Sequence, residues 1–304
     1  MEPTQLGELA QPETVDQGMT LAQLAVLAVV QGITEFLPIS SSGHLILVRK
    51  LFGWLGWAFV EGDTAKDVLI DIAVHFGSLG AVLIYFWRDV RALLIGPFQL
   101  LADLPRRGPM RWESRLTLLL ALATVPLVIA GLSLALLDDA TDGDAMERLR
   151  TIEVIGWTTL LYGVALWVAD RFSPKDREIE GWTWSGAILL GLSQALALVP
   201  GTSRSGVTMT AARLLGFERT EAARIALLMA VPAILAASAK LLVDLLEMED
   251  VAFSADVGIA AALSFASAYV ALALMMRMLR TVSFTPFVIY RLALGGLLLW
   301  IAYA

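Results

Sequence analysis

The sequence predicts an all-α integral membrane protein, built as an inverted-topology repeat with six full transmembrane helices plus two re-entrant helix hairpins. The first observation is composition: 58% of the 304 residues are hydrophobic and 17% are charged, which is more apolar than a soluble domain. The second is an internal repeat, and the third is the distribution of Lys and Arg. We expect a single membrane domain over 1–304, with repeat one at about 21–170 and repeat two at about 185–303.

The repeat is found in two polar stretches that interrupt apolar sequence. QGITEFLPISSSGH covers residues 31–44, and SQALALVPGTSRSG covers residues 193–206. They align at an offset of 163 positions. The aligned pairs include Gln31 with Gln194, Ser40 with Ser203, Ser41 with Arg204, Ser42 with Ser205, and Gly43 with Gly206. Such self-similarity indicates two halves derived from one ancestral unit.

Apolar segments along the chain fall into long and short classes. The six that are long enough to span a bilayer lie at about 68–87, 116–137, 152–170, 223–244, 256–277 and 286–303. Two others, 21–37 and 185–199, lead into the polar stretches.

The short segments 43–53 and 206–216 would each rise only about 15 Å as helix, roughly half of the hydrocarbon thickness. Each follows a break, at Pro38 or at Pro200 and Gly201, where a helix cannot continue undisturbed. We therefore expect each polar stretch to be the tip of a re-entrant hairpin, covered by protein or water.

Positive charge supports an inverted arrangement. If both hairpins return to their own side, fourteen Lys and Arg fall on one side and five on the other, and the richer side should be cytoplasmic. Both termini are then periplasmic, and the two hairpin tips enter from opposite faces and meet near the midplane. Residues 1–20 contain acids but no Lys or Arg, unlike a signal peptide. The arginine-rich stretch 88–115 is expected to be a cytoplasmic loop, with an amphipathic helix over 89–114 on the cytoplasmic surface as the alternative.

Charge and cysteine content exclude several classes of function. The formal net charge of -7 argues against a nucleic-acid partner, because no basic face is available to neutralise phosphates. The chain has no Cys, which excludes disulfides, thiolate metal sites and a cysteine nucleophile.

The polar tips have the chemistry of an anion site. Hydroxyl groups, free backbone N–H groups and two helix N-termini would converge there, and Arg204 adds a forked cation suited to phosphate oxygens. Glu35 lies one turn after Gln31, so both side chains share a helix face. A carboxylate beside a phosphate requires a divalent cation between them or a role as base. Hydrolysis is therefore favoured over simple binding.

These stretches resemble the undecaprenyl pyrophosphate phosphatase family, also called the bacitracin resistance protein. The family signatures, an (E/Q)GxxE run leading into PxSSxGH and a PGxSRSG run, match residues 31–44 and 200–206, and the likeness extends to SFTPFVIYR at 283–291. The resemblance implies a bacterial inner-membrane enzyme that removes the terminal phosphate from undecaprenyl diphosphate, recycles the peptidoglycan lipid carrier and confers bacitracin resistance. It also implies a divalent cation (Mg²⁺ or Ca²⁺), an active site facing the periplasm, and a homodimer. Many members have glutamate where this chain has Gln31, so Glu35 must contribute more.

Roles follow from mapping the resemblance onto this chain. The catalytic candidates are Glu35, Ser41, His44 and Arg204. The substrate-binding candidates are Gln31, Ser40, Ser42, Gly43, Thr202, Ser203, Ser205, Gly206 and Thr208. Glu35 and Gln31 are the candidate cation ligands. The nucleophile stays open: Ser41 attacks with Glu35 or His44 as base, or those groups activate water.

Several alternatives remain. His44 is either a catalytic group or only a residue at a helix start. Asp71 and His75, four apart on one span, either reach the site or form a satisfied buried pair. Because inverted repeats with broken helices are typical of transporters, the chain is alternatively a carrier or flippase for a phosphate-bearing lipid or anion.

Overall fold

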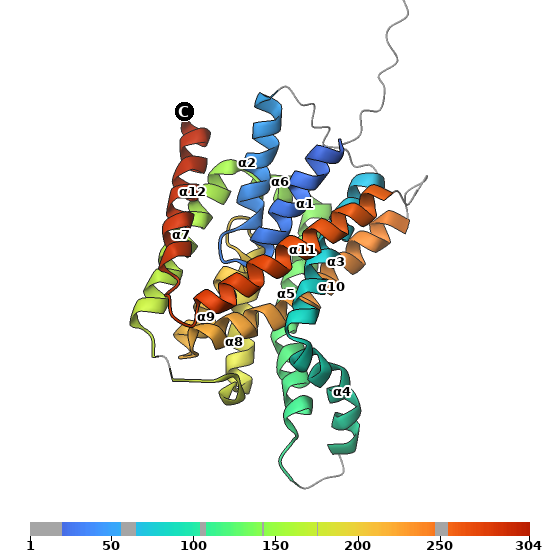
Figure 1. Ribbon diagram of the computed structural model, residues 1–304, viewed down its shortest axis with the longest axis vertical. Coiled ribbons are helices and arrows are strands. Elements are labelled where there is room, and N and C mark those ends of the chain that lie inside the picture. The colour runs from blue at the N-terminus through green and yellow to red at the C-terminus, as the bar shows by residue number, and fades with distance from the viewer. Residues whose placement is uncertain (1–19, 56–64, 104–107, 142, 175, 247–254) are drawn as a thin grey trace, which may run out of the picture.

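The computed structural model describes residues 20–55, 65–103, 108–141, 143–174, 176–246 and 255–304, and throughout these ranges the chain is helical with no strand (Figure 1). The α-helices are α1 (Leu21–Phe36), α2 (Ser41–Trp54), α3 (Ala65–Tyr85), α4 (Trp87–Asp103), α5 (Trp112–Ala140), α6 (Asp144–Leu149), α7 (Ile152–Phe172), α8 (Trp184–Ala195), α9 (Arg204–Leu214), α10 (Arg219–Leu246), α11 (Ala255–Met278) and α12 (Thr285–Tyr303). Two 3₁₀ turns, η1 (Ile179–Gly181) and η2 (Leu196–Leu198), flank α8. The prediction about a signal peptide falls mainly on residues outside the described ranges.

The predicted transmembrane helices are confirmed as six long apolar helices. They are α3, α5, α7, α10, α11 and α12, and each contains a window of sufficient hydropathy to cross a membrane. Leu132, Leu136 and Leu161 expose about two thirds of their surface (63%, 70% and 66%), as expected where lipid replaces water. The chain is therefore a multi-pass membrane protein.

Helices of the two halves pack on one another rather than within separate bundles. In the first half, α1 and α3 pack against α11, whereas α8 of the second half packs against α5. Helix α7 pairs with α12, and α3 with α10. Small residues allow the close approach: a Cβ on Gly32 would lie 2.5 Å from the Ser264 carbonyl oxygen. The two sequence repeats consequently share one interior.

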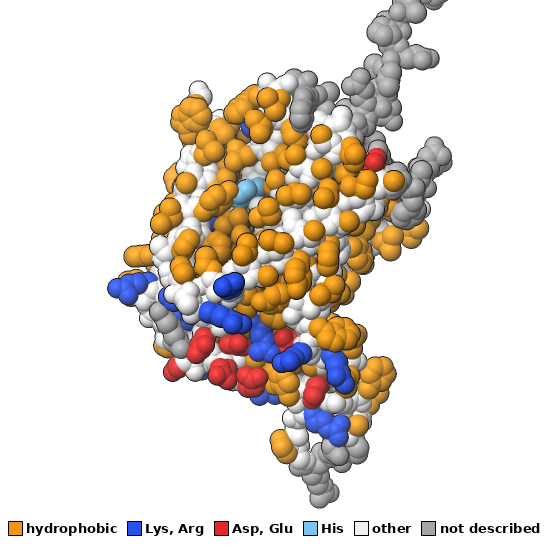
Figure 2. Space-filling view, in the orientation of Figure 1, with side chains coloured by type: hydrophobic (Ala, Val, Ile, Leu, Met, Phe, Trp, Pro, Cys, Tyr) orange, Lys and Arg blue, Asp and Glu red, His pale blue; other side chains and the backbone are white. Residues whose placement is uncertain are grey.

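Charged side chains gather at one end of the molecule, below a largely hydrophobic surface (Figure 2). Asp170 of α7 accepts hydrogen bonds from Arg213 (3.2 Å) and Arg219 (2.7 Å). Asp89 of α4 pairs with Arg224 of α10 at 2.5 Å. Ion pairs therefore join α4, α7, α9 and α10 at the end that the charge pattern assigns to the cytoplasm.

The stretch 88–115 differs from the predicted loop. Most of it is helix α4, which packs along α5 and buries Asp89, Val90 and Gly96 (Figure 1). The helix forms although Pro97 lies within it, and its low apolar content hid it from a search for membrane spans. The loop prediction is wrong, and the alternative of a helix is correct.

Candidate active site

The first polar stretch forms a sharp turn between α1 and α2. Ser40 adopts φ 73°, an unusual conformation for a residue with a side chain. Its hydroxyl accepts a hydrogen bond from the backbone N–H of Gly43 at 3.4 Å and so caps α2. This turn places Ser41 and Ser42 at the N-terminus of α2.

The second polar stretch repeats this geometry. Ser203, the equivalent of Ser40, adopts φ 67° and accepts from the N–H of Gly206 at 3.2 Å. Helix α9 begins at Arg204, as α2 begins at the equivalent Ser41. We call the segments 37–43 and 200–206 the first and second serine loops.

The two serine loops contact each other through equivalent residues. The Ser42 hydroxyl accepts a hydrogen bond from the Gly201 N–H at 3.0 Å. The Ser205 hydroxyl donates to the Leu37 carbonyl oxygen, also at 3.0 Å. Ser42 and Ser205 are aligned by the repeat, so each loop uses the same serine to hold the other. The structure thus brings together two segments about 160 residues apart.

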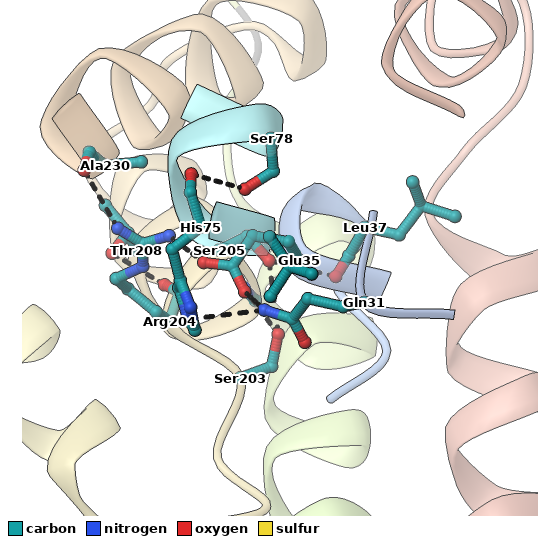
Figure 3. Close-up of polar contacts among 12 residues, drawn as sticks. Gln31, Glu35, Leu37, His75, Ser78, Ser203, Arg204, Ser205, Thr208 and Ala230 are labelled. Carbon is teal, nitrogen blue, oxygen red and sulfur yellow. Dashed lines mark hydrogen bonds and ion pairs between the residues drawn. The ribbon is translucent and has the colours of Figure 1, made fainter. Parts of the chain in front are cut away.

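An ion pair between the two halves is the centre of the site (Figure 3). Arg204 Nη2 lies 2.6 Å from Glu35 Oε1, and the two side chains are 17% and 10% exposed. Arg204 Nη1 donates to the Ala230 carbonyl oxygen at 3.0 Å, and Glu35 Oε2 accepts from Gln31 Nε2 at 2.7 Å. A pair this poorly solvated is retained only with good geometry and further hydrogen bonds, and both are present.

Of the pair Asp71 and His75, only the histidine reaches this centre. His75 Nε2 lies 3.4 Å from Gln31 Nε2 (Figure 3), and its Nδ1 is 2.7 Å from the backbone oxygen of Asp71. The Asp71 side chain is exposed. The alternative of a satisfied buried pair is therefore wrong, because the histidine bonds the aspartate backbone and not its carboxylate.

His44 points to a different neighbour. Its Nδ1 lies 2.7 Å from the Ser40 carbonyl oxygen, and its Nε2 lies 2.7 Å from the hydroxyl of Tyr290 on α12. The two rings also stack, with centroids 5.4 Å apart. Because a carbonyl oxygen only accepts, Nδ1 donates to Ser40, and Nε2 shares a hydrogen bond with the Tyr290 hydroxyl, which can donate or accept. Sequence reasoning missed Tyr290, which contacts His44 from near the C-terminal end of the sequence.

The remaining candidates lie in or beside the serine loops. The hydroxyl of half-buried Ser41 makes no hydrogen bond to the described residues. Thr208 donates to the Arg204 carbonyl oxygen at 2.9 Å, and the Ser203 and Ser205 hydroxyls lie 3.2 Å apart. Thr202 is fully buried, and its hydroxyl has no hydrogen-bond partner within the described ranges. Ser41 is therefore the candidate hydroxyl with most freedom to turn.

Arg291 is a site residue to which sequence reasoning gave no role. It is fully buried in α12 and donates to four backbone oxygens: Thr159 (3.1 Å), Pro38 (3.3 Å), Gly201 (3.1 Å) and Thr202 (3.1 Å). One guanidinium thus joins both serine loops to α7 and α12. The available signal was an arginine within an apolar span, which is rare without a function.

Arg291→Lys is expected to destabilise the protein and slow any reaction at the loops. A lysine cannot reproduce the planar fork, and each buried carbonyl left without a donor costs about 1–3 kcal/mol. We expect a lower melting temperature in detergent and a lower catalytic rate. The matched control is Arg277→Lys, because Arg277 is exposed on α11. Equal melting temperatures for wild type and Arg291→Lys would contradict the role of Arg291 in joining the two serine loops.

Gly201→Ala tests the second serine loop. Gly201 has φ 88°, and an added Cβ would overlap Thr158 Oγ1 and lie 2.6 Å from the Ile155 carbonyl oxygen. Left-handed backbone alone costs a residue with a side chain about 1–2 kcal/mol, and the overlap adds to this. We expect a clear fall in thermal stability, whereas Gly296→Ala on α12, which meets nothing within 4 Å, should have little effect. An unchanged melting temperature in Gly201→Ala would rule out the tight packing of this loop.

The oxygen atoms at the site fit a shared divalent cation. No three His, Asp or Glu side chains of the described residues lie close enough to hold a metal by themselves. The Glu35 carboxylate adjoins the Gln31 amide, whose Oε1 is buried and has no hydrogen-bond partner among these described residues. Mg²⁺ is commonly held by one or two carboxylates together with waters and substrate phosphates. These residues therefore suit a cation held jointly with a phosphate.

The chain is similar to known proteins over most of its length. The model of the bacitracin resistance protein BacA family matches residues 24–297. The undecaprenyl-diphosphatase of Ruegeria sp. (strain TM1040) is 49% identical over 286 residues, covering 94% of this chain and all of that protein. The undecaprenyl-diphosphatases of Ruegeria pomeroyi and Alteromonas mediterranea are 49% and 40% identical, each with 94% of this chain and all of the relative covered.

Proposed function

This chain belongs to the bacitracin resistance protein BacA family, and we propose that the two serine loops form the active site with which it dephosphorylates undecaprenyl diphosphate. The activity yields undecaprenyl phosphate and inorganic phosphate, and it serves peptidoglycan lipid recycling and bacitracin resistance. The observation that carries the proposal is the contact between Glu35 and Arg204, which joins an acid of the first half to a cation of the second.

Arg204 binds and stabilises the diphosphate in this proposal. Phosphoryl transfer spreads charge over the equatorial oxygens, and fixed positive groups that need no reorganisation lower its barrier. The side chain is held by Glu35 and by the Ala230 carbonyl oxygen, so it is oriented before substrate arrives. Backbone N–H groups at the starts of α2 and α9 supply further donors.

Two routes fit the nucleophile. In one, Ser41 Oγ attacks the terminal phosphorus, the bond from phosphorus to the bridging oxygen breaks, and undecaprenyl phosphate leaves; Glu35 or His44 takes the hydroxyl proton, and water then hydrolyses the phosphoserine. In the other, water attacks directly. The unpartnered Ser41 hydroxyl at a helix N-terminus supports the first route. Acid quenching during turnover, followed by mass spectrometry of the peptide containing Ser41, separates the routes.

A divalent cation, Mg²⁺ or Ca²⁺, is part of the proposal. Glu35 and Gln31 would hold it, and when bound it would neutralise charge on the diphosphate. The Glu35 carboxylate also accepts hydrogen bonds from Arg204 and Gln31, which hold it in place beside the phosphate.

We place the site in an inverted repeat with two re-entrant hairpins in the bacterial inner membrane, facing the periplasm, with both termini periplasmic. Three observations support this topology: the equivalent backbone of Ser40 and Ser203, the cross-packing of the halves, and the charged end seen in Figure 2. Labelling of single cysteines from each side of the membrane tests it. A homodimer is a further proposal, to be checked by light scattering of the purified protein.

The function is tested by phosphate release from undecaprenyl diphosphate, using purified protein in detergent with Mg²⁺. Release by wild type and its loss in Glu35→Ala and Arg204→Ala support the proposed site. Binding of the lipid without release would instead indicate a carrier or flippase. Release that persists in both variants would place the active site elsewhere.

A further inference from the structure

The hydrogen bonds of His75 fix which ring nitrogen carries the proton. Its Nδ1 is 2.7 Å from the backbone oxygen of Asp71, and a carbonyl oxygen only accepts. Nδ1 is therefore a donor. The other ring nitrogen, Nε2, lies 3.4 Å from Gln31 Nε2 (Figure 3), an amide nitrogen that only donates, so Nε2 is the acceptor of this contact. His75 thus acts as an acceptor toward α1.

The amide group of Gln31 is consequently held at its nitrogen by two acceptors. Glu35 Oε2 lies 2.7 Å from Nε2, and His75 Nε2 lies 3.4 Å from the same atom. One acceptor determines which end of the amide faces Glu35, and the second restricts rotation about the last side-chain bond. Gln31 is 4% exposed, and its Oε1 has no hydrogen-bond partner in the part of the chain that the structure describes. A buried acceptor without a partner is uncommon and requires an explanation.

We propose that His75 is a positioning residue that turns the Gln31 carbonyl oxygen toward a divalent cation. This inference rests on the proposed function, which requires a cation beside the diphosphate. A glutamate at position 31, as the family signature allows, offers two equivalent oxygens and needs no such orientation. A glutamine has one oxygen and one NH₂ group, so the site must select the oxygen. Partners that orient a metal ligand in this way strongly influence metal affinity.

A merely structural role for His75 predicts a different outcome. If the histidine only fastened α3 to α1, its loss would lower thermal stability without a specific change in cation affinity. The two roles therefore separate in a direct binding measurement. Mn²⁺ serves as the probe, because its free concentration is read by electron paramagnetic resonance without substrate or turnover.

The experiment compares the Mn²⁺ dissociation constants of full-length wild type, His75→Ala and Asp71→Asn in detergent at one pH. We expect His75→Ala to bind about 10–100-fold more weakly. Asp71→Asn is the matched control, since only the backbone of Asp71 contacts the histidine, and it should stay within about 2-fold of wild type. If His75→Ala proves too unstable to purify, His75→Gln, which keeps an acceptor in reach, should bind between wild type and Gln31→Ala.

The decisive arm is rescue by Gln31→Glu. In that background His75→Ala should weaken Mn²⁺ binding by less than about 3-fold, because a carboxylate needs no orienting partner. The same loss in both backgrounds, or unchanged binding in His75→Ala, would overturn the role of His75 while wild type still binds and hydrolyses. Phosphate release by wild type that persists after divalent cations are removed with a chelator would refute the cation requirement itself, and this inference with it.

Discussion

Replacing Arg204 with lysine is expected to lower kcat for phosphate release by about 10²–10³-fold, the usual effect of removing one preorganised donor to a developing charge. Lysine keeps the charge but loses the planar fork. In this chain one arm of the fork binds Glu35 and the other binds the Ala230 carbonyl oxygen. A lysine cannot hold both while facing a phosphate, so the charge would no longer be fixed in place.

The control for Arg204→Lys is Arg224→Lys. Arg224 is also a poorly exposed arginine paired with a carboxylate, at 2.5 Å from Asp89, but it lies at the charged end of the molecule. We expect Arg224→Lys to lower the melting temperature and to leave kcat within about 3-fold, since it removes no donor to the phosphate. Similar kcat losses in both variants would mean that Arg204 supports the fold and not the reaction.

Replacing Glu35 with glutamine should separate catalysis from binding. The variant keeps the shape of the side chain but removes the charge that holds a cation or accepts a proton, and we expect kcat to fall by about 10²–10⁴-fold. Binding of substrate should persist, because Arg204 loses its carboxylate partner and its charge becomes fully available to the diphosphate. Steady-state phosphate release and equilibrium binding of undecaprenyl diphosphate measure the two effects separately.

The matched control is Glu221→Gln, which removes another partly buried carboxylate, one paired with Arg224 at 3.2 Å. It should leave kcat and binding close to wild type. If Glu35→Gln instead weakened lipid binding and left kcat unchanged, Glu35 would be a structural partner of Arg204 and not a catalytic group.

Much of the fold was predictable because a helix that crosses the lipid bilayer must be long and apolar. All six spans could be found from length and apolar content. Helix α4 was not, because it contains charged residues and Pro97, and its stability comes from packing on α5 and from the pair of Asp89 with Arg224. Such contacts depend on a distant segment, which apolar periodicity does not reveal.

The site was predictable where its residues belong to the internal repeat, and was not where they contact it from distant segments. The repeat indicated that Glu35 and Arg204 belong to equivalent stretches, and the structure shows them in contact. It did not indicate that Arg291 joins the loops or that Tyr290 contacts His44, since both lie on α12, far from either motif. The role of His75 could not be predicted because its ring is oriented by a hydrogen bond to the backbone oxygen of Asp71. Every residue has such an oxygen, so the sequence gives no signal for this bond.

The central claim is that one diphosphate head group contacts both serine loops at once. The chain has no Cys, so Ser41→Cys and Ser203→Cys each introduce a single thiol in a half-buried position. Modification by a small thiol reagent is followed as a non-hydrolysable prenyl diphosphonate is added. We predict that both thiols are protected with the same half-maximal concentration of diphosphonate. Protection of one thiol alone, at any concentration, would contradict a site shared by the two loops.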